Sequence, residues 1–257
     1  MSAWAGLKRS LPMAFSVFLE IADDGRCMAH AMDLPGCIAR AETREAALSQ
    51  VPQAIREYHA WLRRHGEAVL PPCEPLELRV GGEARGSGPF DPGDAAALFP
   101  PDCEPISREE IECFFCLMAY SRSDLLGLAL GLPDELLDWE RGPGSFSIRR
   151  VLRHVGNAEE WYVSRIVPVD RLPLEWQDDE AMPTFEFLAM ERRTALAQLR
   201  ALDTEQRSGM FRPSAWTDHP EEPWTARKVL RRFVEHEREH SGQVAEILAA
   251  GGRPRAL

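Results

Sequence analysis

A segment rich in glycine and proline divides this chain of 257 residues into two parts with different hydrophobic patterns. Residues 81–106 hold the clusters Gly81-Gly82, Gly86-Ser-Gly-Pro89, Pro92-Gly93 and Pro100-Pro101. Turn-forming residues at this density prevent long regular elements. We therefore predict a linker over 81–106, between an N-terminal domain over 10–80 and a C-terminal domain over 107–252.

The N-terminal part shows the alternation of apolar and polar residues that is typical of half-buried strands, followed by one amphipathic helix. Thr43 is the expected N-cap of this helix, and Pro52 predicts a kink or an interruption within it. These features predict a small antiparallel β-sheet plus one helix, with strands over residues 13–21, 26–31, 38–41 and 76–80.

The C-terminal part is predicted to be helical throughout, so the fold class of the whole chain is α+β. Ser107-Arg-Glu-Glu110 matches a capping box and opens the first helix, which ends before Pro133. Four amphipathic helices of this kind predict a four-helix bundle. We expect the remaining three over residues 147–167, from about 184 to 199, and from about 225 to 250.

Composition and charge limit the classes of partner. The net charge of −11 opposes binding to a phosphate backbone, so nucleic acid is not an expected partner. The longest apolar stretch, residues 125–132, is too short to cross a membrane, and the N-terminus lacks a secretory signal. We therefore expect a cytoplasmic protein that has no membrane partner.

The six cysteines are scattered without the spacing of a disulfide scaffold, which fits a reducing compartment. Cys113 and Cys116 form a C-x-x-C pair that could be a redox or metal site. The pair lies within a helical apolar pattern, however, and this pattern predicts that both thiols are packed in the core.

Two histidines lie one helical turn apart on the apolar face of the last predicted helix. Side chains four residues apart are neighbours on a helix, so the imidazoles of His236 and His240 can converge on one metal ion. His154, beside the apolar stripe of the helix over 147–167, is the candidate for a third ligand. The alternative is a set of hydrogen-bonded core histidines. The seam of the last helix comprises Val229, Phe233, His236, His240, Val244 and Ile247.

The N-terminal part contains three short motifs: Asp24-Gly25, Asp33-Leu-Pro-Gly-Cys37, and Thr43 with Glu45-Ala46. Through these motifs it resembles the HicB-like family of small αβ antitoxin domains over roughly residues 10–80. The resemblance implies a domain that dimerises, so a homodimer is expected. As antitoxins, such domains pair with a small RNase toxin and use a separate DNA-binding tail. The helical part of this chain stands where that tail would follow.

Three motifs of the C-terminal part belong together. They are Ser147-Ile-Arg-Arg-Val-Leu-Arg-His154 with Glu159 and Trp161, Pro223-Trp-Thr-Ala-Arg-Lys-Val-Leu230, and His236-Glu-Arg-Glu-His240-Ser-Gly-Gln243. Through these motifs the C-terminal part resembles the DinB-like family of metal-binding four-helix bundles over roughly residues 107–250. The resemblance implies that His154, His236 and His240 bind Zn²⁺ or Ni²⁺. It also implies thiol S-transferase or isomerase activity with a low-molecular-weight thiol, although many members have no assigned reaction.

The segment from His236 to His240 also satisfies the H-E-x-x-H signature of zinc proteases, in which Glu237 would be the general base. Such proteases take a third ligand downstream, and no histidine follows His240. We therefore exclude this interpretation and expect Glu237 to face away from the metal.

Two functions remain open. The first is a metal-dependent thiol S-transferase or hydrolase acting on a small molecule, in which the N-terminal domain adds dimerisation or regulation. Three imidazoles leave a coordination position open, which is the pattern of a catalytic site. Glu159 is then the candidate catalytic residue, either as a base or as an acceptor for a ligand N–H, unless it is a solvated helix glutamate. The second is a non-catalytic binding or antitoxin-like regulatory protein with a structural or vestigial metal.

Overall fold

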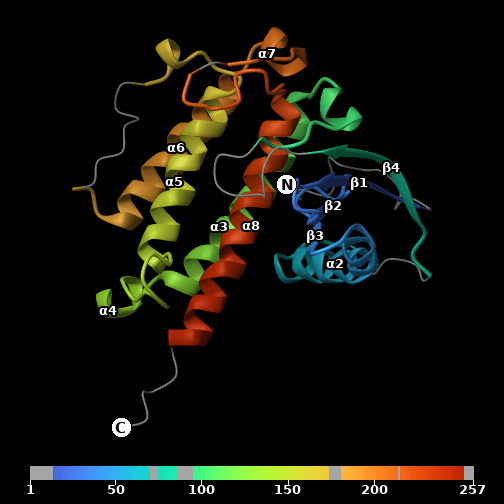
Figure 1. Ribbon diagram of the computed structural model, residues 1–257. Coiled ribbons are helices and arrows are strands. Elements are labelled where there is room, and N and C mark those ends of the chain that lie inside the picture. Colours follow the sequence, from blue (N-terminus) through green and yellow to red (C-terminus); the bar gives the residue numbers. More distant parts are fainter. Residues whose placement is uncertain (1–13, 70–74, 86–94, 174–180, 214, 252–257) are drawn as a thin grey trace.

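The computed structural model describes residues 14–69, 75–85, 95–173, 181–213 and 215–251. It confirms the α+β class: a four-stranded sheet with one helix stands beside a bundle of four long helices (Figure 1). No helix in these ranges is both long enough and apolar enough to cross a lipid bilayer.

The sheet is mixed, whereas the sequence predicted an antiparallel one. Its strands are β1 (Phe15–Ile21), β2 (Cys27–Ala31), β3 (Ile38–Ala41) and β4 (Leu78–Arg85), in the order β3-β2-β1-β4. The β1–β2 and β2–β3 pairs are antiparallel, but β4 pairs in parallel with β1. The reason is the connection: β3 runs in the direction of β1, and a helix crossover after it returns the chain in that same direction.

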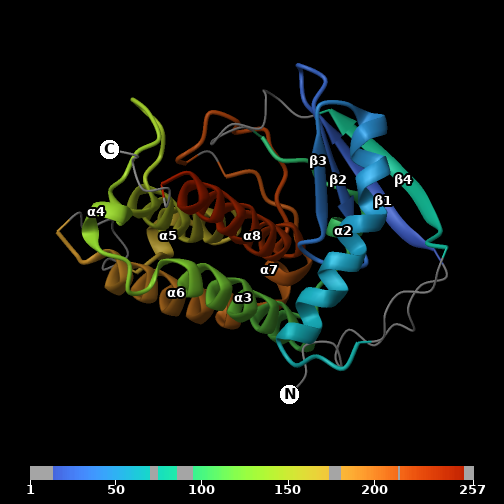
Figure 2. The same cartoon turned by 90° about the horizontal axis from the view of Figure 1, so that it is seen from below.

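The crossover helix α2 (Arg44–Arg64) covers one face of the sheet (Figure 2). Thr43 caps it as predicted, because its Oγ1 accepts a hydrogen bond from the backbone N–H of Ala46 at 3.2 Å. The interruption expected at Pro52 is wrong, since the helix continues through that residue. Burial of the flanking Val51 and Ile55 offsets the lost hydrogen bond, which costs roughly 3 kcal/mol in a helix interior.

Strand β4 runs into the predicted linker. The pairing of β4 with β1 is shifted between Val17 and Phe18, so that Gly81 is the extra residue of a β-bulge. The Phe18 ring lies over this point, and a Cβ atom on Gly81 would lie 2.5 Å from the Cζ atom of Phe18. The two glycines therefore extend the strand beneath an aromatic ring instead of ending it.

The bundle consists of α3 (Arg108–Ala129), α5 (Ile148–Ser164), α6 (Thr184–Ala201) and α8 (Ala226–Gly251). Helix α8 contacts α3 and α5, and α6 contacts the same two helices, so that the four form a closed ring. The predicted cap at Ser107 is confirmed, because its side chain accepts a backbone N–H group of the first turn of α3. The side chains of Ser147 and Thr225 accept backbone N–H groups of the first turns of α5 and α8 in the same way. The connections add the short helices α4 (Asp134–Leu137), α7 (Thr204–Ser208), η1 (Pro100–Cys103) and η2 (Val169–Arg171).

Helix α8 lies between the sheet and the rest of the bundle (Figure 1). One cluster of buried apolar side chains is continuous from Leu19 of β1 and Trp61 of α2 to Val234 of α8 and Met118 of α3. The two parts predicted from the sequence therefore share a core. The segment before η1 closes the junction through Phe99, whose ring lies 5.3 Å from that of Phe18.

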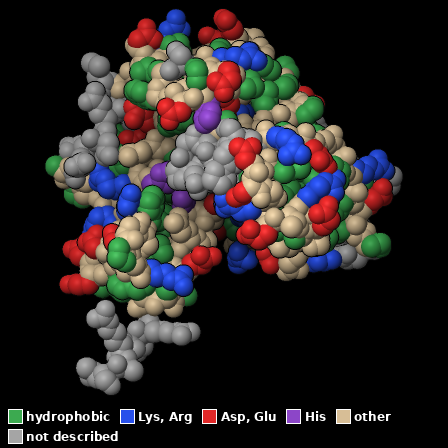
Figure 3. All heavy atoms as spheres, in the orientation of Figure 1, with side chains coloured by type: hydrophobic (Ala, Val, Ile, Leu, Met, Phe, Trp, Pro, Cys, Tyr) green, Lys and Arg blue, Asp and Glu red, His purple; other side chains and the backbone are tan. Residues whose placement is uncertain are grey.

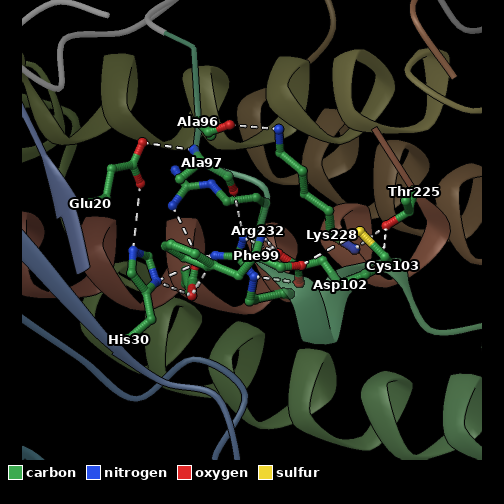
Figure 4. Close-up of polar contacts among 12 residues, drawn as sticks. Glu20, His30, Ala96, Ala97, Phe99, Asp102, Cys103, Thr225, Lys228 and Arg232 are labelled. Carbon is green, nitrogen blue, oxygen red and sulfur yellow. Dashed lines mark hydrogen bonds and ion pairs between the residues drawn. The ribbon is translucent and has the colours of Figure 1, made fainter. Parts of the chain in front are cut away.

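Buried charges cross the same junction (Figure 4). The Arg231 guanidinium donates to both carboxylate oxygens of Asp102, at 2.9 and 2.8 Å, and to Glu235 at 2.9 Å. Glu235 also lies 2.8 Å from the Nδ1 atom of His30 on β2. The Lys228 ammonium donates to Glu222 at 2.8 Å. We call these six residues the junction network, and all of them are buried.

The turn before β3 packs tightly on α8 at Gly36, which gives a test of the junction. Gly36 has a φ of +88°, and a Cβ atom on it would lie 2.4 Å from the Cγ1 atom of Val234. We expect Gly36→Ala to lower the free energy of unfolding by about 3 kcal/mol, because backbone strain and overpacking add.

Gly25→Ala is the matched control. Gly25 has a φ of +92°, and no atom lies within 4 Å of the position that a Cβ atom would take there. This variant introduces backbone strain without a steric clash. We therefore expect its free energy of unfolding, measured by urea denaturation, to fall by only about 1 kcal/mol. Equal losses in the two variants would show that the turn does not press on α8.

Candidate metal centre

Three histidines from two helices of the bundle meet at one point. The Nε2 atom of His236 lies 3.0 Å from the Nε2 atom of His154 on α5 and 3.1 Å from the Nε2 atom of His240. All three ligand atoms lie within 4.8 Å of one another. The structure thus brings together the three residues that the sequence singled out, although His154 and His236 are 82 positions apart in the chain.

These separations fit one small cation. Two nitrogens that each lie about 2.05 Å from a zinc-sized ion and about 3.0 Å apart subtend an angle of roughly 95°, close to the angles of metal sites. The Nδ1 atom of His240 faces the Oε1 acceptor of Gln243 at 2.7 Å, so Nδ1 carries the proton and Nε2 presents its lone pair. Lone pairs that converge in this way repel one another unless a proton or a cation lies between them.

Each of the three rings is half-buried, and Figure 3 shows histidine side chains reaching the surface in a hollow of the molecule. Aromatic rings support the site: Phe146 lies 6.1 Å from the ring of His154, and Tyr162 lies 5.6 Å from that of His236. The ligands are therefore held by packing and still face solvent.

Burial makes the imidazoles weak bases. Desolvation, with a contribution from the charge of His240, lowers the pKa of His154 to about 4. Desolvation and the two neighbouring imidazoles hold the pKa of His236 well below 6.5. Desolvation also lowers the pKa of His240. The neutral form, which binds metal, is therefore the dominant form near neutral pH.

The inner side of the site is closed. The gap between the side chains beside His236 has no room for a water molecule. It is bounded by Glu159, Arg192 and Glu237. An outside molecule must consequently approach the histidines from the solvent side.

Beneath this gap lies a buried ion cluster that the sequence analysis missed. Arg192 donates to Glu159 at 2.8 Å and to Glu237 at 3.0 Å. Arg122 of α3 donates to the same two carboxylates, and Ser121 donates to Glu237 at 2.6 Å. Two guanidinium groups thus neutralise two carboxylates and tie four helices together. The available signal was Arg122 itself, which stands at a core position between Met118 and Leu125 on an apolar helix face.

The cluster decides the positions of two glutamates. Glu159 is 2% exposed, so the interpretation as a solvated helix glutamate is wrong. Both of its carboxylate oxygens accept hydrogen bonds from arginines. Glu237 is buried in the same cluster, and Arg192 and Arg122 hold its pKa below the ordinary value although desolvation raises it. This agrees with the expectation that Glu237 is not a protease base.

The cysteines lie apart from the histidines. Cys113 is buried in α3 and Cys116 is half-buried there, and both are free thiols, as predicted for core residues. Within the described residues, Cys27, Cys37 and Cys103 are also free. The prediction for Cys73 lies outside the described residues.

Comparison with known proteins identifies the superfamily of this part of the chain. Residues 118–244 match the model of the DinB superfamily. This part of the chain is therefore a DinB superfamily domain, and all three histidines lie within it.

A second relationship concerns a shorter stretch. Over 57 residues the chain is 32% identical to the UPF0150 protein Ta0767 of Thermoplasma acidophilum. This alignment covers 22% of this chain and 83% of that protein. Over those 57 residues the chain belongs to the UPF0150 family.

A similar solved structure is that of YfiT from Bacillus subtilis, described as a probable metal-dependent hydrolase with an unusual four-helix bundle topology. The sequence identity is 19% and the TM-score is 0.42, over 59% of this chain and 93% of that chain.

The low pKa values predict a metal affinity that depends little on pH. Three histidines with the ordinary pKa of about 6.5 would lose roughly fiftyfold in affinity between pH 7.5 and pH 6.0, because protons compete for every ligand. The lowered values keep the neutral form at pH 6.0, so we expect a loss below about fivefold. Zn²⁺ competition with a chelator, corrected for the chelator's own protonation, measures this, and a fiftyfold loss would contradict it.

The ion cluster predicts a strong dependence on paired charges. Arg192→Met leaves two buried carboxylates with one guanidinium, and we expect the free energy of unfolding to fall by about 3–5 kcal/mol. Adding Glu159→Gln to that variant restores the charge balance and should recover more than half of the loss. Additive losses in urea denaturation would show that the two residues do not act as a pair.

Proposed function

We propose that this protein is a metal-dependent enzyme of the DinB superfamily that acts on a small molecule, as a thiol S-transferase or as a hydrolase. His154, His236 and His240 hold a divalent ion, Zn²⁺ or Ni²⁺. A low-molecular-weight thiol is the proposed co-substrate of the transferase reaction.

The observation that supports this proposal most directly is the convergence of three Nε2 atoms, two pairs of which are 3.0 and 3.1 Å apart. Among the described residues, the metal-ligating group contains these three members and no fourth. A structural zinc site is closed by four protein ligands, whereas a catalytic site has three and keeps a position for water or substrate. The DinB superfamily match covers all three ligands.

A divalent ion at such a site lowers the pKa of a bound water or thiol, and so provides a nucleophile near neutral pH. The surrounding residues prepare the ligands. Gln243 fixes the tautomer of His240, and Tyr162 and Phe146 fix the orientations of the other two rings. The neutral imidazoles add no charge that would oppose an anionic nucleophile.

We infer that Glu159 supports the site from beneath and is not its base. Its carboxylate is occupied by Arg122 and Arg192, and the same two arginines hold Glu237, the residue that follows His236. Through these two arginines Glu159 is linked to Glu237, so the cluster ties α5 to α8, the two helices that carry the ligands. The nucleophile would then lose its proton to solvent or to groups on the solvent side of the site.

We further propose that the sheet and α2 form a HicB-like module that contributes dimerisation or regulation. The 57-residue relationship to a UPF0150 protein and the strand-helix-strand order of the module support this. We place the enzyme in the cytoplasm, because the free thiols of the described cysteines fit a reducing compartment.

Metal content tests the proposal. The protein is purified without a histidine tag, and its metal is measured by mass spectrometry alongside His154→Ala and His240→Ala. We expect about one equivalent of Zn or Ni in the parent protein and less than about a tenth in either variant, because two imidazoles from a three-ligand site bind far more weakly.

His219→Ala is the control, since His219 lies beside Glu221 and outside the cluster. It should keep its metal. A metal-free parent protein of unchanged stability after metal addition would overturn the proposal. Transfer assays with bacillithiol, mycothiol, glutathione and coenzyme A then separate the transferase from the hydrolase.

A further inference from the structure

Arg232 stands one helical turn before His236 on α8, so that Arg232, His236 and His240 follow one another at four-residue intervals on one side of the helix. Its positive charge contributes to the low pKa of both histidines. Desolvation raises the pKa of Tyr162, whose ring lies 5.6 Å from that of His236, and the positive charge of Arg232 opposes that rise. Arg232 is therefore a neighbour of the metal centre.

The hydrogen-bonding capacity of Arg232 is only partly used. Its Nη1 atom donates to Glu235 at 3.0 Å, but its Nε atom is buried and has no hydrogen-bond partner within the described part of the chain. The adjacent Arg231 differs sharply, since its Nε, Nη1 and Nη2 atoms all donate to Asp102, Glu235 or the carbonyl oxygen of Ala97. A buried donor without an acceptor is costly and rare in native proteins.

The acceptor that Arg232 lacks is not available from the neighbouring carboxylates. Glu235 already accepts from Arg231 and lies against His30. Glu239, on the same side of α8, pairs with Arg40 of β3 at 3.0 Å. The Arg232 side chain is nevertheless 14% exposed, so a group brought by a ligand can reach the outer part of its guanidinium.

We infer that Arg232 anchors a carboxylate of the small molecule that enters the metal centre, and thereby selects anionic ligands. The inference rests on the proposed function, because it assumes that the histidines hold a metal to which the ligand binds. A carboxylate matches the planar guanidinium, and hydrogen bonds between ionised groups are about twice as strong as neutral ones. The neutral imidazoles place no negative charge in its way.

The test compares two thiols that differ only in charge. The protein is loaded with Co²⁺ and titrated with 3-mercaptopropionate and with its uncharged amide, and binding is read from the thiolate-to-cobalt absorption. We expect the parent protein to bind the anionic thiol about tenfold more tightly than the amide, as for one charge-assisted hydrogen bond. In Arg232→Gln this preference should fall below about twofold, while Arg232→Lys, which keeps the charge and loses the planar fork, should be intermediate.

Arg153→Gln is the matched control. Arg153 precedes the ligand His154 in the chain, but its guanidinium donates to the carbonyl oxygen of Met182 and lies 4.4 Å over the Phe187 ring. Arg153→Gln also removes one positive charge near the site, but it should leave the preference for the anionic thiol unchanged. The cobalt spectrum of each variant before thiol addition shows that the site is intact.

An equal preference in the parent protein and in Arg232→Gln would overturn the role of Arg232 and leave the proposed function standing. A fall of the same size in Arg153→Gln would also overturn it, since the effect would then be general electrostatics. Failure of the parent protein to bind Co²⁺, or to bind either thiol, would instead count against the proposed function.

Discussion

The junction network is the interaction on which the rest of this structure depends. Arg231 and Glu235 of α8 are buried against Asp102 and His30, where an unpaired charge would cost several kcal/mol. Arg231, Glu235 and Asp102 keep their partners only if the sheet, η1 and α8 keep their relative positions. Because α8 also carries His236 and His240, the same constraint fixes the metal ligands.

Helix α8 consequently has three functions on three sides. One side pairs with the sheet through the junction network, one reaches the ion cluster through Glu237, and the side between them presents the histidines. A helix held on two sides loses little further freedom when a ligand binds to the third, which favours tight metal binding. The αβ part is thus a structural support of the metal centre as well as a candidate regulatory module.

The buried arginines near the site are of two kinds: some are fully paired with carboxylates, and one keeps a donor without a partner among the described residues. Arg122 and Arg192 are paired with Glu159 and Glu237, so the cluster beneath the histidines is closed and neutral. Arg232, at the edge, keeps a buried donor unpaired among the described residues. The first arrangement stabilises the bundle, and the second is the kind of feature that native proteins retain at binding sites.

The sequence by itself determined the local elements and the pair of ligands on one helix. Capping at Ser107, Ser147 and Thr225 and the apolar periodicity depend on residues within a few positions of one another, so they can be read along the chain. Only the tertiary structure decided that β4 runs parallel to β1, that His154 meets His236, and that Arg122 and Arg192 share two glutamates. These pairings join distant segments, and local spacing carries no information about which of several compatible partners a buried group will meet.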